Sequence, residues 1–208
     1  MKQRELLILP FNTYLGPDQL EQVAMRAVVA FGGAYAAAGI LPPMEIRPSN
    51  ALEMFARNVE TQRYDALKAD LGKGLIRDFN VFAGGHDECV YHGLAITDML
   101  LSYKGFRAGG FADKDYGVAL ATERDISLSD IREGTFIRRL AGVAVHELGH
   151  LYGLGHHDSE ITPGLYCPMI NRTWDDPEFR DERARGAFQD SRADAFCGSC
   201  YKAIEGEK

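Results

Sequence analysis

The sequence predicts an α/β protein in which a twisted, mostly parallel sheet packs against helices, with a small irregular C-terminal lobe. Strand-like and helix-like patterns alternate over residues 1–155, the order that builds layered α/β folds. An irregular, polar tail follows over residues 156–208. The chain has 208 residues, of which 46% are hydrophobic and 25% charged. We therefore expect one domain, 1–208, with an upper part (1–155) and a lower part (156–208).

The N-terminal region carries the patterns of two strands and two helices. The apolar run Glu5–Pro10 predicts a strand. Pro17 opens a helical stretch in which apolar residues recur every three or four positions, and Gly39 is expected to close it. The other two predicted elements are the strand Met44–Arg47 and the helix Tyr64–Leu71.

The central region adds further strands before the long helix. Residues 84–94 fit no regular pattern and indicate a loop. Ala95–Leu101 and Tyr116–Thr122 have strand patterns, and the glycine-rich block between them predicts a short edge strand near Phe111. The predicted helices of the second half are Thr135–Tyr152, Glu182–Phe188 and one after Cys197.

Charge and hydropathy exclude two classes of partner. The net charge of −7 argues against a broad nucleic-acid surface, which needs clustered Lys and Arg. No apolar run approaches the ~18 residues of a membrane span. The apolar stretch Leu6–Leu9 is too short for a secretory signal, and Pro10 interrupts it. We therefore expect a cytoplasmic protein that binds neither nucleic acid nor membrane.

The segment 146–156 reads HELGHLYGLGH and ends the long predicted helix. Residues i and i+4 of a helix share one face, so His146 and His150 can bind one metal ion. Gly153 lets the chain turn back and present His156 as a third ligand. Three imidazoles suit zinc and leave its fourth position open. The alternative is incidental surface histidines, but four of the six histidines fall within twelve residues.

Glu147 follows the first histidine, where its carboxylate can reach a zinc-bound water. Zinc lowers the pKa of such a water to about 7, and Glu147 can take its proton and pass it to the leaving amine. The pattern HExxHxxGxxH marks the metzincin group of zinc peptidases. The motif thus predicts cleavage of a peptide or protein substrate. Two alternatives stay open: a zinc-bound interaction or regulatory protein with little or no peptidase activity, and hydrolysis of a non-peptide amide.

The four cysteines indicate a second metal site more than disulfides. Thiols stay reduced in the cytoplasm, and a CxxC pair such as Cys197–Cys200 is there a metal or redox element. The redox reading expects the pair between a strand and a helix of a thioredoxin-like unit. Here the pair lies close to the C-terminus, which favours metal.

Together these residues resemble the archaemetzincins. That family combines the zinc motif with a cysteine just before a methionine and a closing CxxC, matched here by Cys167-Pro168-Met169 and Cys197–Cys200. The segments ITDMLL and YGVALA resemble the strands that precede its active-site helix. The resemblance implies a metzincin-type zincin fold, with Met169 in the Met-turn beneath the catalytic zinc. It also implies a second, structural zinc held by four cysteines.

One ligand of that second zinc differs here, because His157 stands where the family has cysteine. We hypothesise that His157, Cys167, Cys197 and Cys200 hold a structural zinc, since a Cys₃His site is chemically sound. Its purpose would be to fold a tail that is poor in apolar residues. Cys89 or Asp158 are alternative fourth ligands, and free thiols beside a solvated His157 are the other interpretation.

The resemblance also implies where a substrate binds. An extended peptide would pair with an edge strand, here Gly109–Asp113, and Tyr166 and Ile170–Arg172 are candidates for a specificity pocket. Two further groups lack any recognised ligand spacing and are interpreted as solvated surface: the loop His86-Asp87-Glu88-Cys89 with His92, and the acidic run Asp175–Glu182.

Overall fold

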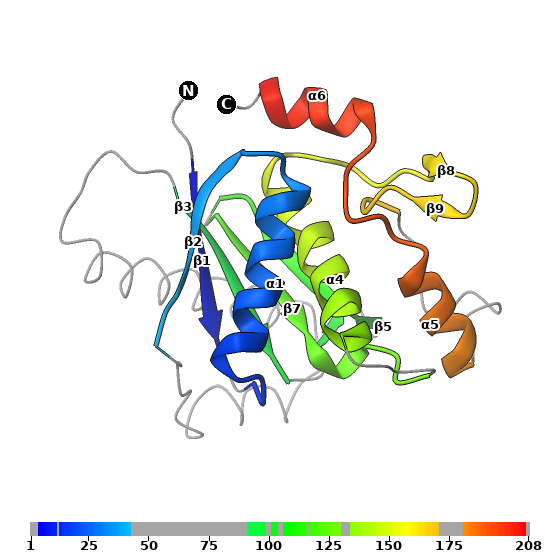
Figure 1. Cartoon of the computed structure of the whole chain (residues 1–208), viewed down its shortest axis with the longest axis horizontal. Helices are drawn as coiled ribbons and strands as arrows, with labels where there is room; N and C mark the ends of the chain where they lie inside the picture. Colours follow the sequence, from blue (N-terminus) through cyan, green and yellow to red (C-terminus); the bar gives the residue numbers. More distant parts are fainter. Residues whose placement is uncertain are drawn as a thin grey trace.

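Figure 1 shows the computed structural model, which describes residues 4–11, 13–42, 91–98, 101–103, 106–115, 117–129, 134–170 and 181–206. The predicted strand Met44–Arg47, the predicted helix Tyr64–Leu71 and the segment His86–Cys89 lie outside these residues. None of the described helices is long and apolar enough to cross a membrane.

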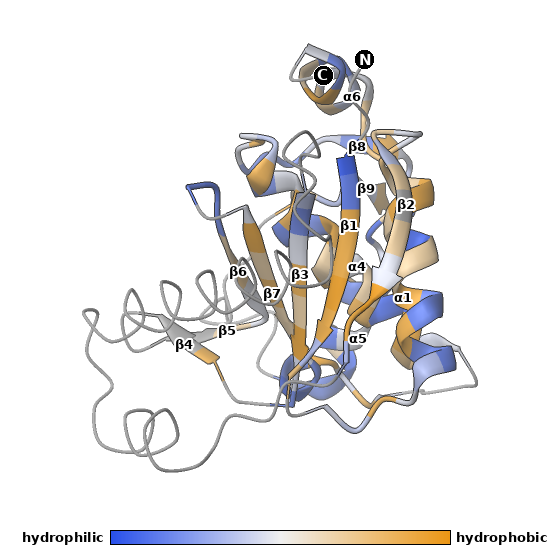
Figure 2. Ribbon diagram, turned by 90° about the vertical axis from the view of Figure 1, so that its left-hand side faces the viewer, coloured by the Kyte–Doolittle hydropathy of each residue, from blue (hydrophilic) through white to orange (hydrophobic). Residues whose placement is uncertain are grey.

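A five-stranded, mostly parallel sheet forms the centre of the fold, as predicted. Its strand order is β2-β1-β3-β7-β6, and only the edge strand β6 is antiparallel to its neighbour. Central strands of a parallel sheet are covered on both faces and are therefore hydrophobic throughout, as Figure 2 shows for most of β1. The strands are β1 (Arg4–Pro10), β2 (Tyr35–Ile40), β3 (Tyr91–Thr97), β6 (Gly110–Asp113) and β7 (Val118–Thr122).

Two helices, α1 (Pro17–Ala30) and α4 (Thr135–Leu151), lie side by side on one face of this sheet (Figure 1). Successive side chains of a strand point to opposite faces. Leu6 and Ile8 of β1 accordingly belong to the core cluster beneath the helices, while Leu7 belongs to a second cluster on the other face. The predicted long helix is confirmed at its first residue and to within one residue at its end. Burial on both faces gives the sheet a rigid frame for α4.

The prediction that the first helix closes at Gly39 is wrong. α1 ends at Ala30, because Gly32 and Gly33 take the left-handed backbone, with φ of 55° and 84°. The chain then enters β2, and Gly39 lies inside that strand, where an added Cβ would meet Leu7 Cδ2 at 3.3 Å. Gly39 thus serves close packing between adjacent strands instead of ending the helix.

The third strand starts earlier than predicted. Residues 84–94 were expected to be a loop and Ala95–Leu101 a strand, whereas β3 runs from Tyr91 to Thr97 and pairs with both β1 and β7. His92 and Gly93 hide the strand pattern, since both are unusual in a buried strand. Leu101–Tyr103 (β4) instead pairs with Phe106–Ala108 (β5) in a separate two-stranded sheet.

The C-terminal tail is more regular than predicted. The two expected helices are confirmed as α5 (Glu182–Asp190) and α6 (Gly198–Gly206). Outside the tail, a 3₁₀ turn, η1 (Glu123–Asp125), follows β7. The tail also contains an antiparallel hairpin, β8 (Glu160–Thr162) and β9 (Leu165–Tyr166), which was not predicted. These strands are too short to show a hydrophobic period.

The tail packs onto the N-terminal half through α1. The rings of Phe31 and Phe196 lie 4.8 Å apart, edge to face, and the Tyr201 hydroxyl donates a hydrogen bond of 2.9 Å to the Ala30 carbonyl. Cys200 and Ile204 belong to the same core cluster as Leu6 and Ile8. Because one core joins both ends of the described chain, we propose that residues 1–208 form a single domain, with 1–155 and 156–208 as its upper and lower parts.

A buried polar cluster lies where β2, β3 and the end of α4 meet. Tyr35 Oη and His92 Nδ1 are 2.8 Å apart, and the Arg4 guanidinium stands 4.8 Å from the ring centre of Tyr152. His92 is 5% exposed, so the predicted solvated loop is wrong at this residue. Burial, followed by the charges of Arg4 and Lys114, lowers the pKa of His92 to about 3.

Replacing His92 with glutamine is expected to make folding less sensitive to acid. The folded state lowers the pKa of His92 from 6.5 to about 3, so the unfolded chain binds one more proton between these values. Stability from this group is complete above the unfolded pKa and is lost as the pH falls below it, by at most about 1.4 kcal/mol per pH unit. Urea unfolding of both proteins at pH 7 and pH 5 tests this, and identical losses of unfolding free energy would contradict it.

Candidate metal centres

Three histidines converge at the end of α4, as the motif predicts. His146 and His150 lie one turn apart on the helix. Gly153, with φ of 73°, ends the helix and turns the chain back toward His156. One ring nitrogen of each histidine lies within 4.8 Å of those of the other two, and the Nε2 atoms of His146 and His156 are 3.2 Å apart.

Backbone carbonyls orient two of these rings. His146 Nδ1 lies 2.7 Å from the Pro168 carbonyl oxygen, and His150 Nδ1 lies 2.8 Å from that of Leu154. A carbonyl only accepts, so each Nδ1 donates and each Nε2 keeps a lone pair. Burial, more than any other cause, lowers the pKa of His146 and favours its neutral, metal-binding form.

The histidine geometry fits a zinc ion. In a tetrahedral site with Zn–N bonds of 2.0–2.1 Å, two ligand nitrogens stand roughly 3.3 Å apart. The 3.2 Å between His146 Nε2 and His156 Nε2 agrees with this. Among the described residues, His157 belongs to a different group, so only three protein ligands converge here.

Glu147 is enclosed between α4 and the edge strand β6. Its side chain is only 7% exposed. Gly110 of β6 makes this packing possible, because a Cβ there would lie 2.6 Å from Glu147 Cγ and 2.3 Å from the Leu120 carbonyl oxygen. The absence of a side chain at Gly110 thus brings the strand edge close to the carboxylate beside the three histidines.

Two charged residues near Glu147, Arg192 and Asp125, were not predicted from the sequence. Burial lowers the pKa of Arg192 to about 10, while the charges of Glu147 and Asp125 act to raise it. The stem of Arg192 packs on α4 at Gly142, where a Cβ would lie 3.7 Å from Arg192 Cδ. Asp125 is 4% exposed. The two carboxylates and the guanidinium therefore lie in one region of the protein. Residues far apart in the sequence form this region, so no local motif predicts it.

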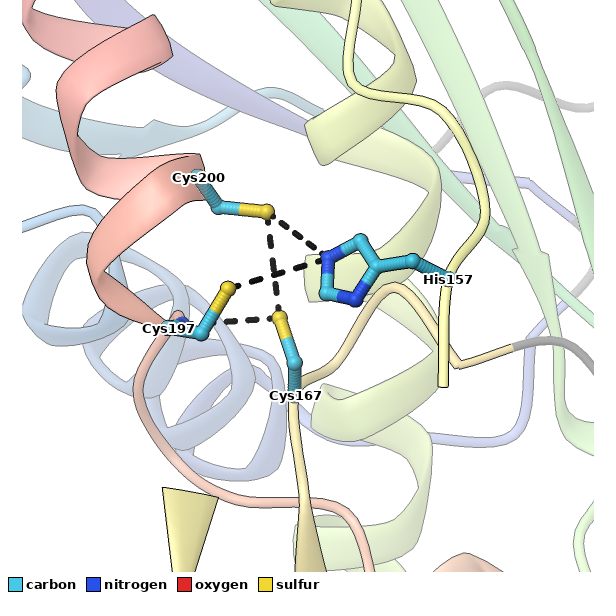
Figure 3. A group of neighbouring side chains, drawn as sticks. All are labelled: His157, Cys167, Cys197 and Cys200. Atoms are coloured by element: carbon cyan, nitrogen blue, oxygen red, sulfur yellow. Dashed lines mark hydrogen bonds between the residues drawn. The ribbon is translucent and has the colours of Figure 1, made fainter. Parts of the chain in front are cut away.

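A second group of ligands lies in the tail (Figure 3), formed by His157, Cys167, Cys197 and Cys200. One atom from each lies within 4.8 Å of the others, and the cysteines are free thiols. We call these four residues the tail centre. The structure therefore brings together the four residues that the sequence hypothesis named. Asp158 is exposed and outside the group, and Cys89 lies outside the described residues.

The tail centre also fits a zinc ion. Cys167 Sγ and Cys200 Sγ are 3.9 Å apart, close to the about 3.8 Å expected for two sulfurs bound to one tetrahedral zinc. His157 Nε2 lies 3.0 Å from Cys200 Sγ and 3.8 Å from Cys197 Sγ. Burial alone would raise the pKa of the Cys197 thiol, but hydrogen bonds from Ser199 and the Cys200 backbone lower it to about 7. Cys197 is thus poised to act as a thiolate.

Met169 lies directly under the histidine-bearing turn of α4. It is fully buried, and a Cβ on Gly149 would come within 2.4 Å of its Sδ atom. The Met169 carbonyl accepts a hydrogen bond of 3.2 Å from the backbone N–H of His157. This position beneath the histidines is the one that the resemblance implied for the Met-turn.

Replacing Gly149 with alanine is expected to destabilise the protein by about 1–2 kcal/mol. The new methyl group would collide with Met169 Sδ at 2.4 Å, and such overpacking outweighs the gain of about 1 kcal/mol in helix propensity. Gly155→Ala is the matched control, because no atom lies within 4 Å of its Cβ position. Urea unfolding compares each variant with the native protein, and a Gly149→Ala protein at least as stable as the native one would show that Met169 gives way freely.

The sheet and the histidine geometry together define a metzincin-like fold. Its features are a mostly parallel sheet with an antiparallel edge strand, and a helix with two histidines that meet a third after a glycine turn. No family model matches the sequence, and a comparison with curated proteins found no match.

Solved structures of the same fold match nearly the whole chain. Archaemetzincin from Methanopyrus kandleri aligns with a TM-score of 0.61 at 15% identity, covering 99% of this chain and 96% of that one. A zinc-dependent peptidase from Methanocorpusculum labreanum gives 0.59 at 20% identity, covering 95% and 99%. Archaemetzincin from Archaeoglobus fulgidus gives 0.57 at 17% identity, covering 96% and 99%. The fold is therefore archaemetzincin-like, as the sequence resemblance predicted.

Proposed function

We propose that this protein is a zinc-dependent peptidase. The observation that carries the proposal is the convergence of three histidines, whose pKa values are lowered by burial, beside a buried glutamate that packs against the edge strand β6. The proteins of similar fold include a zinc-dependent peptidase and archaemetzincins, which supports the same activity here.

Each residue then has a distinct role. A zinc ion held by His146, His150 and His156 would polarise the scissile carbonyl and acidify a water molecule. Glu147 accepts the proton of the attacking water and delivers it to the leaving amine. Its enclosure against Gly110 holds the carboxylate in one place, which general base catalysis requires.

The substrate is proposed to be a peptide or protein that binds in extended form. β6 is the edge strand of the sheet, and main-chain groups on its outer side can pair with such a chain. Gly109–Asp113 covers this strand. Tyr166 and Ile170 stay candidates for the specificity pocket, while residues 171–172 lie outside the described chain.

We also propose a second, structural zinc in the tail centre. The distances in the tail centre fit a Cys₃His site. At the other centre, Met169 is proposed to serve as structural support beneath the catalytic zinc. Free thiols in this arrangement suit a reducing compartment, so the cytoplasmic location is kept as a proposal. Metal analysis of the purified protein should find two zinc ions per chain, and one per chain would contradict the second site.

A non-catalytic zinc protein is the main alternative. A purely structural zinc is closed by four protein ligands. His157, the nearest candidate for a fourth ligand, points instead to the tail centre. This placement favours an open, catalytic centre.

A peptide-library digest tests the proposed activity. The protein would be assayed as zinc-loaded, after removal of metal by a chelator, and after zinc is restored. Cleavage that is lost and regained with zinc supports the peptidase. Bound zinc without any cleavage would instead favour an interaction protein, and cleavage only of non-peptide amides would redirect the search for substrate.

A further inference from the structure

The two metal centres share one short stretch of chain, residues 156–169, which we call the bridging hairpin. We infer that the tail centre positions the three-histidine centre, so that metal binding at one strengthens metal binding at the other. This inference rests on the proposed assignment of metal ions to both centres. It concerns their affinity and not the reaction.

The bridging hairpin is an antiparallel ladder whose register shifts once, between Glu160 and Thr162 near its tip. The backbone N–H of His157 donates to the Met169 carbonyl at 3.2 Å, and that of Cys167 donates to the Ser159 carbonyl at 2.9 Å. β8 and β9 extend the ladder to the turn at Gly164. The two arms are therefore fixed relative to each other, and a shift of one arm moves the other.

Each arm contributes to both centres. On the first arm, His156 belongs to the three-histidine centre and its neighbour His157 to the tail centre. On the second arm, Cys167 is in the tail centre, while the next residue, Pro168, accepts the hydrogen bond that orients His146. Consecutive Cα atoms are only about 3.8 Å apart. Fixing His157 and Cys167 thus also fixes a ligand and an orienting carbonyl of the other centre.

The remaining two residues of the tail centre tie the bridging hairpin to the protein core. Cys197 and Cys200 lie at the start of α6, and Figure 3 shows them facing Cys167 and His157 from that side. α6 is itself anchored on α1 through Tyr201. By contrast, residues 160–164 at the tip of the hairpin are exposed. A metal ion in the tail centre would therefore join the bridging hairpin to a fixed point.

The size and symmetry of the coupling follow from general rules. Losing groups that orient metal ligands typically lowers metal affinity by about 10–100-fold. Coupling between two binding sites is reciprocal. Metal in the three-histidine centre must therefore strengthen binding at the tail centre by the same factor.

Cadmium and cobalt ions can report on the two centres separately. Thiolates prefer the softer cadmium, so Cd²⁺ fills the tail centre first and Co²⁺ then binds the three histidines. Co²⁺ bound to thiolate shows charge-transfer absorption that Co²⁺ bound to histidine lacks, which identifies where it has bound. Competition with a chelator gives the Co²⁺ affinity of the three-histidine centre.

His157→Ala weakens the tail centre without touching the three catalytic ligands. We expect about 10–100-fold weaker Co²⁺ binding at the three histidines. His157→Cys should restore the affinity, because it supplies a fourth tail ligand. Lys202→Ala, at an exposed position of α6, is the control and should match the native protein. Native Co²⁺ affinity in His157→Ala, with its tail centre empty of Cd²⁺, would overturn the inference.

The reverse measurement keeps the inference testable even if His157→Ala does not fold. His150→Ala removes one of the three ligands of the three-histidine centre. Cd²⁺ should then bind the tail centre more weakly than in native protein whose three-histidine centre holds Co²⁺, by the same factor. Equal Cd²⁺ affinity in both proteins would mean independent centres and overturn the inference. Because neither readout uses cleavage, an inactive but coupled protein would refute only the proposed peptidase.

Discussion

Replacing Glu147 with alanine is expected to lower kcat/KM for peptide cleavage by about 10²–10⁴-fold, the usual contribution of a general base. Zinc should remain bound, because the three histidines and their orienting carbonyls are unchanged. The expected outcome is therefore a folded, zinc-loaded protein with almost no activity. Cleavage rates and zinc content, measured on the same preparations, check both parts.

Two further variants sharpen this test. Glu147→Gln keeps the size of the side chain and its packing against Gly110 but cannot accept the proton, so it should be as inactive as Glu147→Ala. Glu205→Ala removes an exposed glutamate of α6 and should leave the rate unchanged. Cleavage at the native rate by either Glu147 variant would refute this residue as the base, even if the protein proved to be a zinc peptidase.

The sequence predicted the elements whose signals are local and long. The helix over 135–152 shows its apolar period through four turns, and its interior residues Leu140, Ala144 and Leu148 are fully buried. The spacing of His146 and His150 follows directly from the helix repeat. The start of β3 was missed because the polar His92 is satisfied there by Tyr35, a residue distant in sequence.

The ligands of the candidate site could be predicted from the sequence, but the groups that orient and surround these ligands could not. Residue type and spacing named the three histidines and indicated metal at the CxxC pair, and the resemblance to archaemetzincins added His157 and Cys167. The structure brings these seven residues together in two groups. The Pro168 carbonyl that orients His146 has no signal, since every residue has a carbonyl. Arg192 was missed for a related reason. It is one arginine in a polar tail, and only the packing of α5 against α4 brings it close to Glu147.

An ion pair between a buried arginine of α4 and a half-buried aspartate of α5 connects these two helices. Arg139 is 2% exposed, and its Nε and Nη2 donate to the two carboxylate oxygens of Asp190 at 2.9 and 2.8 Å. Its Nη1 donates to the carbonyls of Ser127 and Ser129 at 2.6 and 2.9 Å. All three guanidinium nitrogens are thus satisfied inside the protein, which a buried arginine requires.

Asp190→Ala is therefore expected to lower the free energy of unfolding by about 3–5 kcal/mol, because it removes the carboxylate that pairs with the buried charge of Arg139. Hydrogen bonds from Arg139 are the main cause that lowers the pKa of Asp190. Stability from this pair is thus present above the ordinary pKa of an aspartate and is lost as the pH falls through the lower, folded value. The loss in Asp190→Ala should accordingly be full at pH 7 and smaller in strong acid.

Asp194→Ala provides the matched control for this pair. Asp194 faces Arg26 at 3.5 Å, but their side chains are 63% and 39% exposed. Exposed pairs of this kind contribute about 0–1 kcal/mol. Urea unfolding at pH 7 should separate the two alanine variants clearly, and a similar small loss in both would show that Arg139 finds water or another partner when Asp190 is removed. A large loss confined to Asp190→Ala would instead establish that the histidine-bearing helix is held by charge as well as by its apolar face.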